Sequence, residues 1–394
     1  MTRRARPTAE PRASARESCP GIVENRRGRQ AHRQPGRTSD QATENRGDSR
    51  STRFSVAIAI VVAGSSTLAR ANDAELDRAT VVFARGAAIY KTDGNGRAEV
   101  ELARLPEGSH ALALRTDAGG RVVIAEVSGG GWWISLDGTA AKWNAVAQCT
   151  AGPAQLDPDG ECVLCRDRTA AGVVVNLGSG RSTAIDVPPT ARIVGSGPQR
   201  RLVWPDATGI WSAPLRDAKR KTRVAPEPPL RAFLPSPDGT RAVGVYASFV
   251  YDGKRQRPAE ILMGFALDGE AARRKMIRTG APLQWSHDNQ WVLVQDGAAA
   301  CVMRANGGQY KCWKGFTAVS IAPDGAYALV LGSRNGAKLP AAPAATKSAI
   351  AEPVATPTGP LALYRAKLDG PFDAPPQLVV KVIDGGAVWI PGRP

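Results

Sequence analysis

The chain has 394 residues and carries 52 Lys and Arg against 36 Asp and Glu, a formal net charge of +16. This length suits two average domains or one large all-β domain, and the 41 Gly and 30 Pro favour many turns over long helices. Residues 1–71 contain 14 Arg and 6 acidic residues, so half of the excess positive charge precedes the remaining chain. This distribution argues against nucleic acid as a partner of the folded part.

Residues 1–53 are rich in Arg, Ser, Thr, Gln, Glu and Pro and show almost no apolar periodicity. A segment of this composition cannot bury enough apolar surface to offset the entropy lost on ordering. We therefore expect a disordered basic leader over 1–53. The alternatives are a tail that binds nucleic acid and upstream sequence included by a start site assigned too early.

The next segment, 54–71, has the features of a secretory signal peptide. Arg53 precedes the apolar stretch 54–63, small polar residues follow, and Ala69-Arg70-Ala71 matches an A-x-A cleavage site. The apolar stretch is too short to span a bilayer, which needs about 20 residues. We predict an exported protein, periplasmic or extracellular, with no transmembrane segment in the mature chain.

A unit of four short strands repeats after residue 72. In each unit a turn of the Pro-Asp-Gly type precedes an apolar strand, as in SPDGTRAVGVY (236–246) and PDGAYALVLG (323–332). A third strand then leads through an Asp-Gly or Asn-Gly hairpin to a fourth. The turns recur about every 40 residues, which is the spacing of propeller blades. The strands expected after the turns are 121–127, 161–166, 200–204, 241–246, 290–295 and 326–331.

The two ends of the repeat region complete one further unit. Residues 78–106 contain candidates for strands two, three and four, and 385–394 contain a candidate first strand. With six internal units, this predicts an all-β fold over 72–394: a seven-bladed β-propeller of four-stranded antiparallel blades, closed by pairing of the N- and C-terminal strands. The Ala/Pro-rich stretch 334–360 is expected to be a flexible insertion within one blade.

The repeat resembles that of the TolB-like, WD40-like (PD40-type) β-propellers of the bacterial envelope. The resemblance covers about 78–394 and is carried by Ser236-Pro237-Asp238-Gly239, Trp285-Ser286-His287-Asp288, Ala322-Pro323-Asp324-Gly325, Ile89-Tyr90-Lys91-Thr92-Asp93-Gly94, and Leu363-Tyr364 through Asp369-Gly370. It implies the propeller fold and an envelope location. TolB itself has an α/β domain before six blades, so the resemblance does not imply the partners of TolB.

Repetition favours a structural role for the turn residues over a chemical one. Pro fixes φ, Asp accepts hydrogen bonds from its own turn, and Gly tolerates positive φ. His287 takes the Pro position of such a turn, and His110, at the start of a first strand, suits a core or rim role. The predicted turn residues are Asp93, Gly94, Asp159, Gly160, Asp238, Gly239, Asp288, Asp324, Gly325, Asp369 and Gly370.

Export permits disulfides among the cysteines that follow the leader. A two-residue Asn306-Gly307 turn would place Cys301 directly opposite Cys312 as a hydrogen-bonded pair, with Cα atoms about 5.5 Å apart, so we predict a disulfide between them. Cys162 and Cys165 lie three apart on a strand and so point to opposite faces. Cys149 is expected to bond one of these two, and the sequence leaves open which.

No catalytic, cofactor-binding or metal-binding residue is predicted. The chain lacks a G-x-S-x-G motif and a phosphate-binding P-loop, and a calcium loop beginning at Asp93 would end on Arg104 instead of Glu. We therefore favour a monomeric, non-catalytic propeller that binds an envelope protein or an anionic glycan and needs no cofactor. The alternative is an enzyme with an active site at the channel mouth, similar to a lactonase or a glycan lyase.

Three basic clusters lie in predicted loops. They comprise 219–223, 254–257 and 273–275, and the first and last fall between third and fourth strands. Such clusters can bind anionic envelope polymers or an acidic partner, or they can be solvated loop charges.

We expect the mature protein to begin at Asn72, because cleavage follows the A-x-A site. N-terminal sequencing or mass mapping of the exported protein measures this. A mature chain that still begins at Met1 would contradict the signal peptide.

Overall fold

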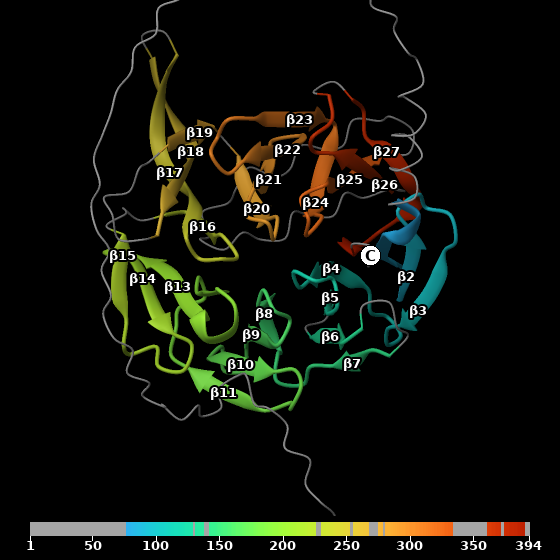
Figure 1. Cartoon of the computed structure of the whole chain (residues 1–394), viewed down its shortest axis with the longest axis horizontal. Coiled ribbons are helices and arrows are strands. Elements are labelled where there is room, and N and C mark those ends of the chain that lie inside the picture. The colour runs from blue at the N-terminus through green and yellow to red at the C-terminus, as the bar shows by residue number, and fades with distance from the viewer. Residues whose placement is uncertain are drawn as a thin grey trace, which may run out of the picture.

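The computed structural model describes residues 76–128, 131–137, 142–225, 230–252, 255–267, 275–278, 280–333, 361–371 and 374–390. They form seven four-stranded antiparallel sheets arranged in a ring, with almost no helix (Figure 1). The seven-bladed propeller predicted from the repeat is confirmed. The predicted leader 1–53, signal peptide 54–71 and insertion 334–360 all lie outside the described residues.

Blades are numbered one to seven from the sheet that joins the two ends of the chain. The first strand of each blade lies on the inside of the ring and the second lies next to it (Figure 1). The first strands are β28 (Ala387–Ile390), β4 (Ala111–Thr116), β8 (Ala151–Leu156), β12 (Arg192–Val194), β16 (Ala232–Pro235), β20 (Ala281–Trp285) and β24 (Phe316–Ile321). The second strands are β1 (Thr80–Arg85), β5 (Val123–Val127), β9 (Cys162–Arg166), β13 (Arg201–Asp206), β17 (Arg241–Asp252), β21 (Trp291–Asp296) and β25 (Tyr327–Ser333).

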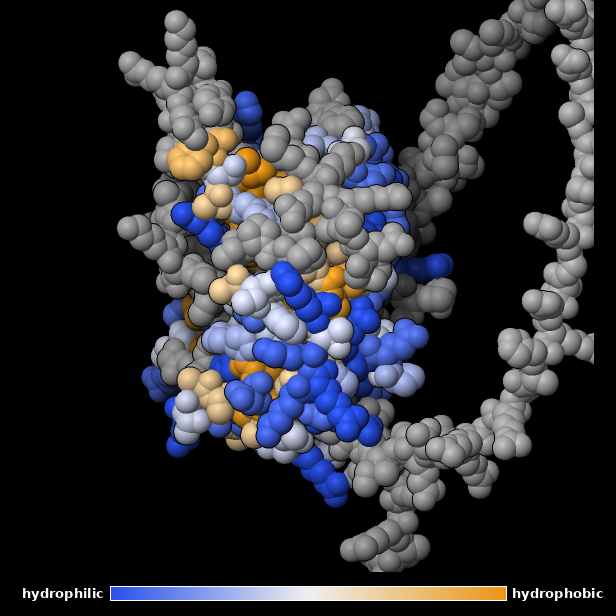
Figure 2. Space-filling view, turned by 90° about the vertical axis from the view of Figure 1, so that its left-hand side faces the viewer, coloured by the Kyte–Doolittle hydropathy of each residue, from blue (hydrophilic) through white to orange (hydrophobic). Residues whose placement is uncertain are grey.

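The third and fourth strands form the outer part of each blade. The third strands are β2 (Ala88–Asp93), β6 (Trp132–Ser135), β10 (Gly172–Asn176), β14 (Gly209–Pro214), β18 (Arg255–Ala266), β22 (Ala299–Arg304) and β26 (Leu361–Lys367). The fourth strands are β3 (Val100–Arg104), β7 (Asn144–Ala145), β11 (Ser182–Ile185), β15 (Thr222–Ala225), β19 (Lys275–Arg278), β23 (Tyr310–Lys314) and β27 (Gln377–Ile383). Figure 2 shows the side of the ring that carries β14, β15 and β17. The described residues on this side are mostly hydrophilic, with hydrophobic residues scattered among them.

Blade one closes the ring, as predicted. Strand β28 pairs antiparallel with β1, so that Val81 lies opposite Trp389 and Val82 lies opposite Val388. These four side chains are at most 2% exposed. The closure therefore buries apolar side chains as well as pairing the backbone of two strands that are distant in sequence.

The apolar core fills the spaces between neighbouring blades. Along β9, for example, Cys165 packs in the cluster between blades two and three, whereas Cys162 packs in the cluster between blades three and four. The predicted opposite orientation of these two cysteines is thus confirmed. It follows from strand geometry, because successive side chains point to opposite faces of a sheet.

The turns between first and second strands are linked from blade to blade. The backbone N–H of Ala118 donates to the Pro158 carbonyl at 3.0 Å, and that of His287 donates to the Pro323 carbonyl at 3.0 Å. Proline has no N–H and can only accept. In alternate blades the Pro position of the turn is therefore taken by another residue, such as His287. The backbone N–H of that residue donates to the Pro carbonyl in the turn of the next blade.

The predicted turn residues fall into three groups. The Asp238 carboxylate accepts from the backbone N–H of Thr240 at 3.0 Å, and Asp93, Asp288 and Asp324 accept from their own turns in the same way. Gly160, Gly239 and Gly325 have φ of 70°, 71° and 69°, which L-residues rarely adopt. Gly94 differs, because a Cβ there would lie 2.7 Å from the Leu76 carbonyl oxygen, and Asp369 and Gly370 lie in the bend after β26.

Asp159 differs from its repeat counterparts. Its carboxylate reaches the next blade, where it forms an ion pair with Arg200 at 2.6 Å and accepts from the Gly197 N–H at 2.7 Å. The turn itself is held by Asp157, whose carboxylate accepts from the N–H groups of Glu161 and Cys162. The DPDG sequence contains two aspartates, and the first of them has the role predicted for the second.

The hairpin between β17 and β18 is much longer than predicted. Both strands have twelve residues and remain paired as far as Asp252 opposite Arg255, so the hairpin extends beyond the ring (Figure 1). The prediction ended the second strand at residue 246. The missed signal is Asp252-Gly253 between alternating apolar residues, which is a strong hairpin pattern.

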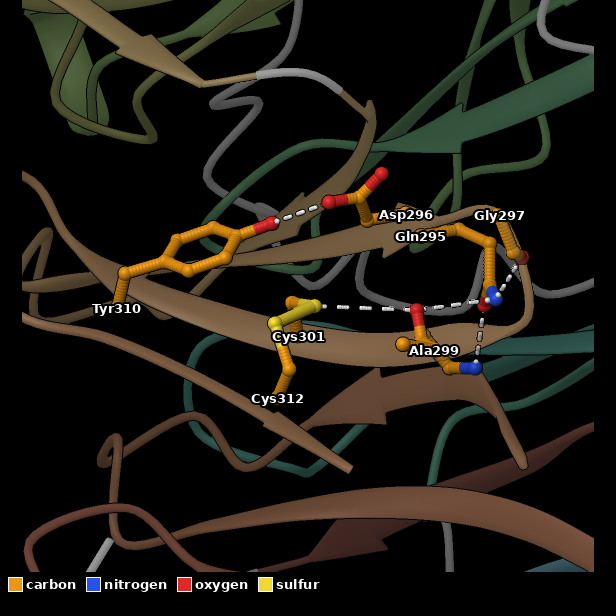
Figure 3. Close-up of a disulfide and its surroundings, with 8 residues drawn as sticks. Gln295, Asp296, Gly297, Ala299, Cys301, Tyr310 and Cys312 are labelled. Atoms are coloured by element: carbon orange, nitrogen blue, oxygen red, sulfur yellow. Dashed lines mark hydrogen bonds between the residues drawn. A yellow bond between two sulfur atoms is a disulfide. The ribbon is translucent and has the colours of Figure 1, made fainter. Parts of the chain in front are cut away.

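Two disulfides are present among the described residues. Cys149 bonds Cys165, which resolves the choice that the sequence left open, and Cys301 bonds Cys312 (Figure 3). The Cα atoms of Cys301 and Cys312 lie 4.1 Å apart, so the predicted hydrogen-bonded pairing with about 5.5 Å is wrong. The hairpin closes at Arg304, whose N–H donates to Gln309, around a four-residue loop, and this shifts the hydrogen-bond alternation by one residue. Both bonds fit an oxidising compartment.

We expect Val388→Asp to destabilise the protein by about 4 kcal/mol, because an unpaired charge would replace a side chain that is 1% exposed in the closing strand. Thermal and denaturant unfolding measure this. Val382→Asp, at a strand position that is 37% exposed, is the matched control and should change stability by less than about 1 kcal/mol. Equal effects of the two substitutions would contradict the closure.

Candidate functional site

Arg115 lies on the inside of the ring, on β4 of blade two. It occupies the place that Gln155 has on β8 and Gln284 has on β20, one residue before the end of the first strand. Gln155 exchanges two hydrogen bonds with the backbone of Ile193 in the next blade, and Gln284 accepts one from Ile321. Among the described residues Arg115 makes no such bond, so its guanidinium is available for another partner.

Two further arginines lie beside the connection from blade three to blade four. Nη1 of Arg166 donates to the Val187 carbonyl at 2.9 Å, and Nη1 of Arg192 donates to the Ala191 and Pro189 carbonyls at 3.0 and 3.3 Å. A guanidinium has five N–H donors. Each arginine is therefore held in place by the backbone and keeps donors for a ligand.

The inner strands are irregular where these arginines lie. The pairing of β8 with β9 shifts register between Ala151 and Gln155. Ala151 lies opposite Arg166 and Gln155 opposite Leu164, so β8 advances four positions while β9 advances two. Strand β12 has only three residues and begins at Arg192, after Pro188 and Pro189. Proline cannot donate to a strand ladder, and bulges often occur next to functional sites because they redirect side chains. Blades three and four thus depart from the repeat at this place.

The three arginines influence one another. Burial, together with the charges of Arg115 and Arg166, lowers the pKa of Arg192 to about 10. Burial also lowers the pKa of Arg115 and of Arg166. The Arg115 residue is exposed to solvent, and Arg166 and Arg192 are partly exposed. All three remain charged at neutral pH, and no carboxylate of the described residues forms an ion pair with any of them.

One carboxylate lies near this cluster. Glu126 of β5 and Arg166 of β9 have corresponding places in their blades, each opposite an alanine of the inner strand. Burial raises the pKa of Glu126, and the nearby charge of Arg115 opposes that rise. We call Arg115, Glu126, Arg166 and Arg192 the channel cluster.

At the end of the ring where the first strands turn back, two blades meet. The turn of blade six lies close enough to blade two for Asp117 and the Thr116 backbone to raise the pKa of His287. These blades are three steps apart, the largest separation in a ring of seven. Burial lowers the pKa of His287, while Asp117 and the Thr116 backbone oppose this, and its Nδ1 is buried without a partner.

The residues singled out in the sequence lie elsewhere. His110 is exposed at the rim, where its backbone pairs with Ser128. In the basic cluster 219–223, Arg220 pairs with Asp217 at 3.1 Å and Lys221 lies 4.5 Å from the centroid of the Trp211 ring. In the cluster 254–257, residues 255–257 begin β18 of the long hairpin, and 254 and most of 273–275 lie outside the described residues.

Sequence reasoning missed the channel cluster. The sequence pattern that could have indicated it is one charged residue within an otherwise apolar strand. The four strands are ALALRT (111–116), VIAEV (123–127), CVLCR (162–166) and RIV (192–194). Such a residue is costly unless it faces water, a partner or a ligand. Within the described part of the chain, no group of three His, Cys, Asp or Glu side chains could hold a metal ion, and no helix is long and apolar enough to cross a membrane.

No protein-family model and no curated protein matches the chain. Similar solved structures include hydrazine synthase from Kuenenia stuttgartiensis, with 13% identity and a TM-score of 0.40 over 56% of this chain and 73% of that one. The C-terminal WD40 domain of Sif2 has 13% identity and a TM-score of 0.44 over 80% and 84%. The dihydro-heme d1 dehydrogenase NirN in complex with DHE has 16% identity and a TM-score of 0.44 over 79% and 75%. The fold assignment rests on the sheet order, and these likenesses add no argument to it.

Proposed function

We propose that this chain is an exported, non-catalytic β-propeller that binds an anionic glycan of the cell envelope through the channel cluster. The observation that carries the proposal is the set of three arginines that influence one another with no carboxylate in ion-pair contact among the described residues. Enclosed like charges repel and lose hydration, so an anion that enters the channel gains strong attraction. The predicted signal peptide, the TolB-like repeat and the two disulfides support the envelope location.

A glycan suits this site better than a protein does. The arginines come from three successive blades, and two of them are held beside the connection 187–191. A flat protein surface does not reach recessed groups, whereas an acidic sugar at the end of a narrow chain does. Guanidinium ions match oxyanions because they donate paired, charge-assisted hydrogen bonds.

We expect the purified protein to bind polygalacturonate and not neutral dextran, with affinity falling as NaCl rises from 50 to 500 mM because salt screens the attraction. Arg115→Met and Arg192→Met should each weaken binding at least about tenfold, the loss expected for one charged hydrogen bond. Arg220→Met, at an exposed rim arginine, is the matched control. Biolayer interferometry measures these affinities, and equal binding of dextran or an equal loss in Arg220→Met would contradict the proposal.

One observation favours the enzymatic alternative. Glu126 has a raised pKa beside Arg115, which is how a general acid and an oxyanion-stabilising group are often arranged. If the site were a lyase or lactonase, Glu126→Gln would abolish turnover of uronides or lactones. A binding propeller gives no turnover, and Glu126→Gln should tighten anion binding, because it removes the competing negative charge. Ultraviolet detection of unsaturated products and titration of binding distinguish the two.

A further inference from the structure

The long hairpin of blade five has a part in which only two of the described strands lie side by side. Strand β16 pairs with β17 no further than Val245, and β19 pairs with β18 no further than Leu262. Beyond these residues β17 and β18 stay paired with each other as far as Asp252 and Arg255 (Figure 1). A two-stranded hairpin is only marginally stable in water. A further strand on one of its edges would therefore stabilise it.

The hydrogen bonds of the blade show which backbone groups point to the open edge of β17. The Val245 carbonyl accepts from the N–H of Arg231 at 2.8 Å, on the side of β17 where β16 lies. In a strand the backbone groups of every second residue point to the same edge. The N–H and C=O groups of Ala247, Phe249 and Tyr251 therefore continue along this edge, where none of the described strands pairs with them.

The two edges of this hairpin differ in their protection against strand pairing. Pro258 takes an outward position on β18, directly opposite Phe249, and has no N–H to donate. Glu260 adds a charge at another outward position of the same strand. Proline and charged residues at edge positions are a common protection against pairing with another chain. The outward positions of β17 carry neither, and Phe249 is 57% exposed, the highest value among the large apolar residues that the structure describes.

We propose that β17 pairs with β17 of a second copy of this chain, antiparallel and across a two-fold axis at Phe249. In this register Phe249 lies opposite its own counterpart and Ala247 lies opposite Tyr251, so all the outward groups form hydrogen-bonded pairs. Asp252 is the only charged residue of β17 beyond its pairing with β16, and it lies opposite Tyr246, so no like charges meet. This dimer goes beyond the proposed function and differs from the monomer expected from the sequence.

A second copy suits this edge because the edge is complementary to itself. A two-fold axis can pass through a hydrogen-bonded pair of antiparallel strands only where the same residue lies on both, and Phe249 is the middle one of the outward residues. The two exposed phenylalanine side chains then lie side by side at the axis. The hairpin extends beyond the ring, so the two rings lie at opposite ends of the shared sheet (Figure 1). Such an edge is smaller than a standard interface, so the dimer is weak and depends on concentration.

Sedimentation velocity of the purified protein from about 1 to about 500 µM should show a shift from monomer to dimer as the concentration rises. Phe249→Lys should weaken this association at least about tenfold, because it places like charges at the two-fold axis. Ala247→Pro removes one outward N–H, keeps Phe249 and should weaken the dimer as well. Leu136→Lys, at a side chain of blade two that is 53% exposed, is the matched control and should leave the association unchanged. Thermal unfolding verifies that each variant is folded.

Amide hydrogen exchange tests the edge itself. The amides of Phe249 and Tyr251 should become protected as the protein concentration rises, whereas that of Gln256, on the opposite edge, should not. A protein that stays monomeric over the whole concentration range, or a dimer that Phe249→Lys weakens no more than Leu136→Lys does, would overturn the proposal. A dimer that leaves the amide of Phe249 unprotected would overturn it too, because that dimer uses another surface.

Discussion

The pairing of β28 with β1 is the constraint on which the propeller depends. It joins residues about 300 positions apart, and closing a loop of that length costs on the order of 5 kcal/mol of chain entropy. The buried side chains of Val81, Phe83, Val388 and Trp389 and the four-residue register offset this cost. Without the pairing, blade one would lose its inner strand and expose a strand edge, and the inner wall of the channel would be incomplete.

The channel cluster arises where an otherwise regular repeat becomes irregular. Six of the inner strands have four to six residues, whereas β12 has three, and β8 contains a bulge beside it. These departures expose backbone carbonyls in the connection before Arg192, which accept hydrogen bonds from Arg166 and Arg192. The regular blades hold these strands in place, and the irregular strands β8 and β12 position the arginine side chains.

The repeat made the architecture predictable, since turn chemistry and apolar alternation are local and recur in every blade. The seven-bladed ring, its closure and the opposite orientation of Cys162 and Cys165 followed from these patterns. The channel cluster did not, because Arg115 of blade two and Arg192 of blade four influence each other only once the blades are placed around a common axis. The hairpin at Cys301 shows a finer limit of prediction. The turn position correctly predicted Cys312 as the residue opposite Cys301, whereas the alternation of hydrogen-bonded and non-hydrogen-bonded pairs depended on the actual length of the loop. The long β17–β18 hairpin was missed although its Asp-Gly signal is present.

The order in which the strands are made bears on how the protein is produced. Because β28 supplies the inner strand of the blade that begins with β1, the ring stays open until residue 390 has been synthesised. Up to that moment an early sheet presents an unsatisfied edge to its surroundings. A chain with this topology cannot complete its tertiary structure until its last strand is made, and its exposed strand edges can aggregate until then.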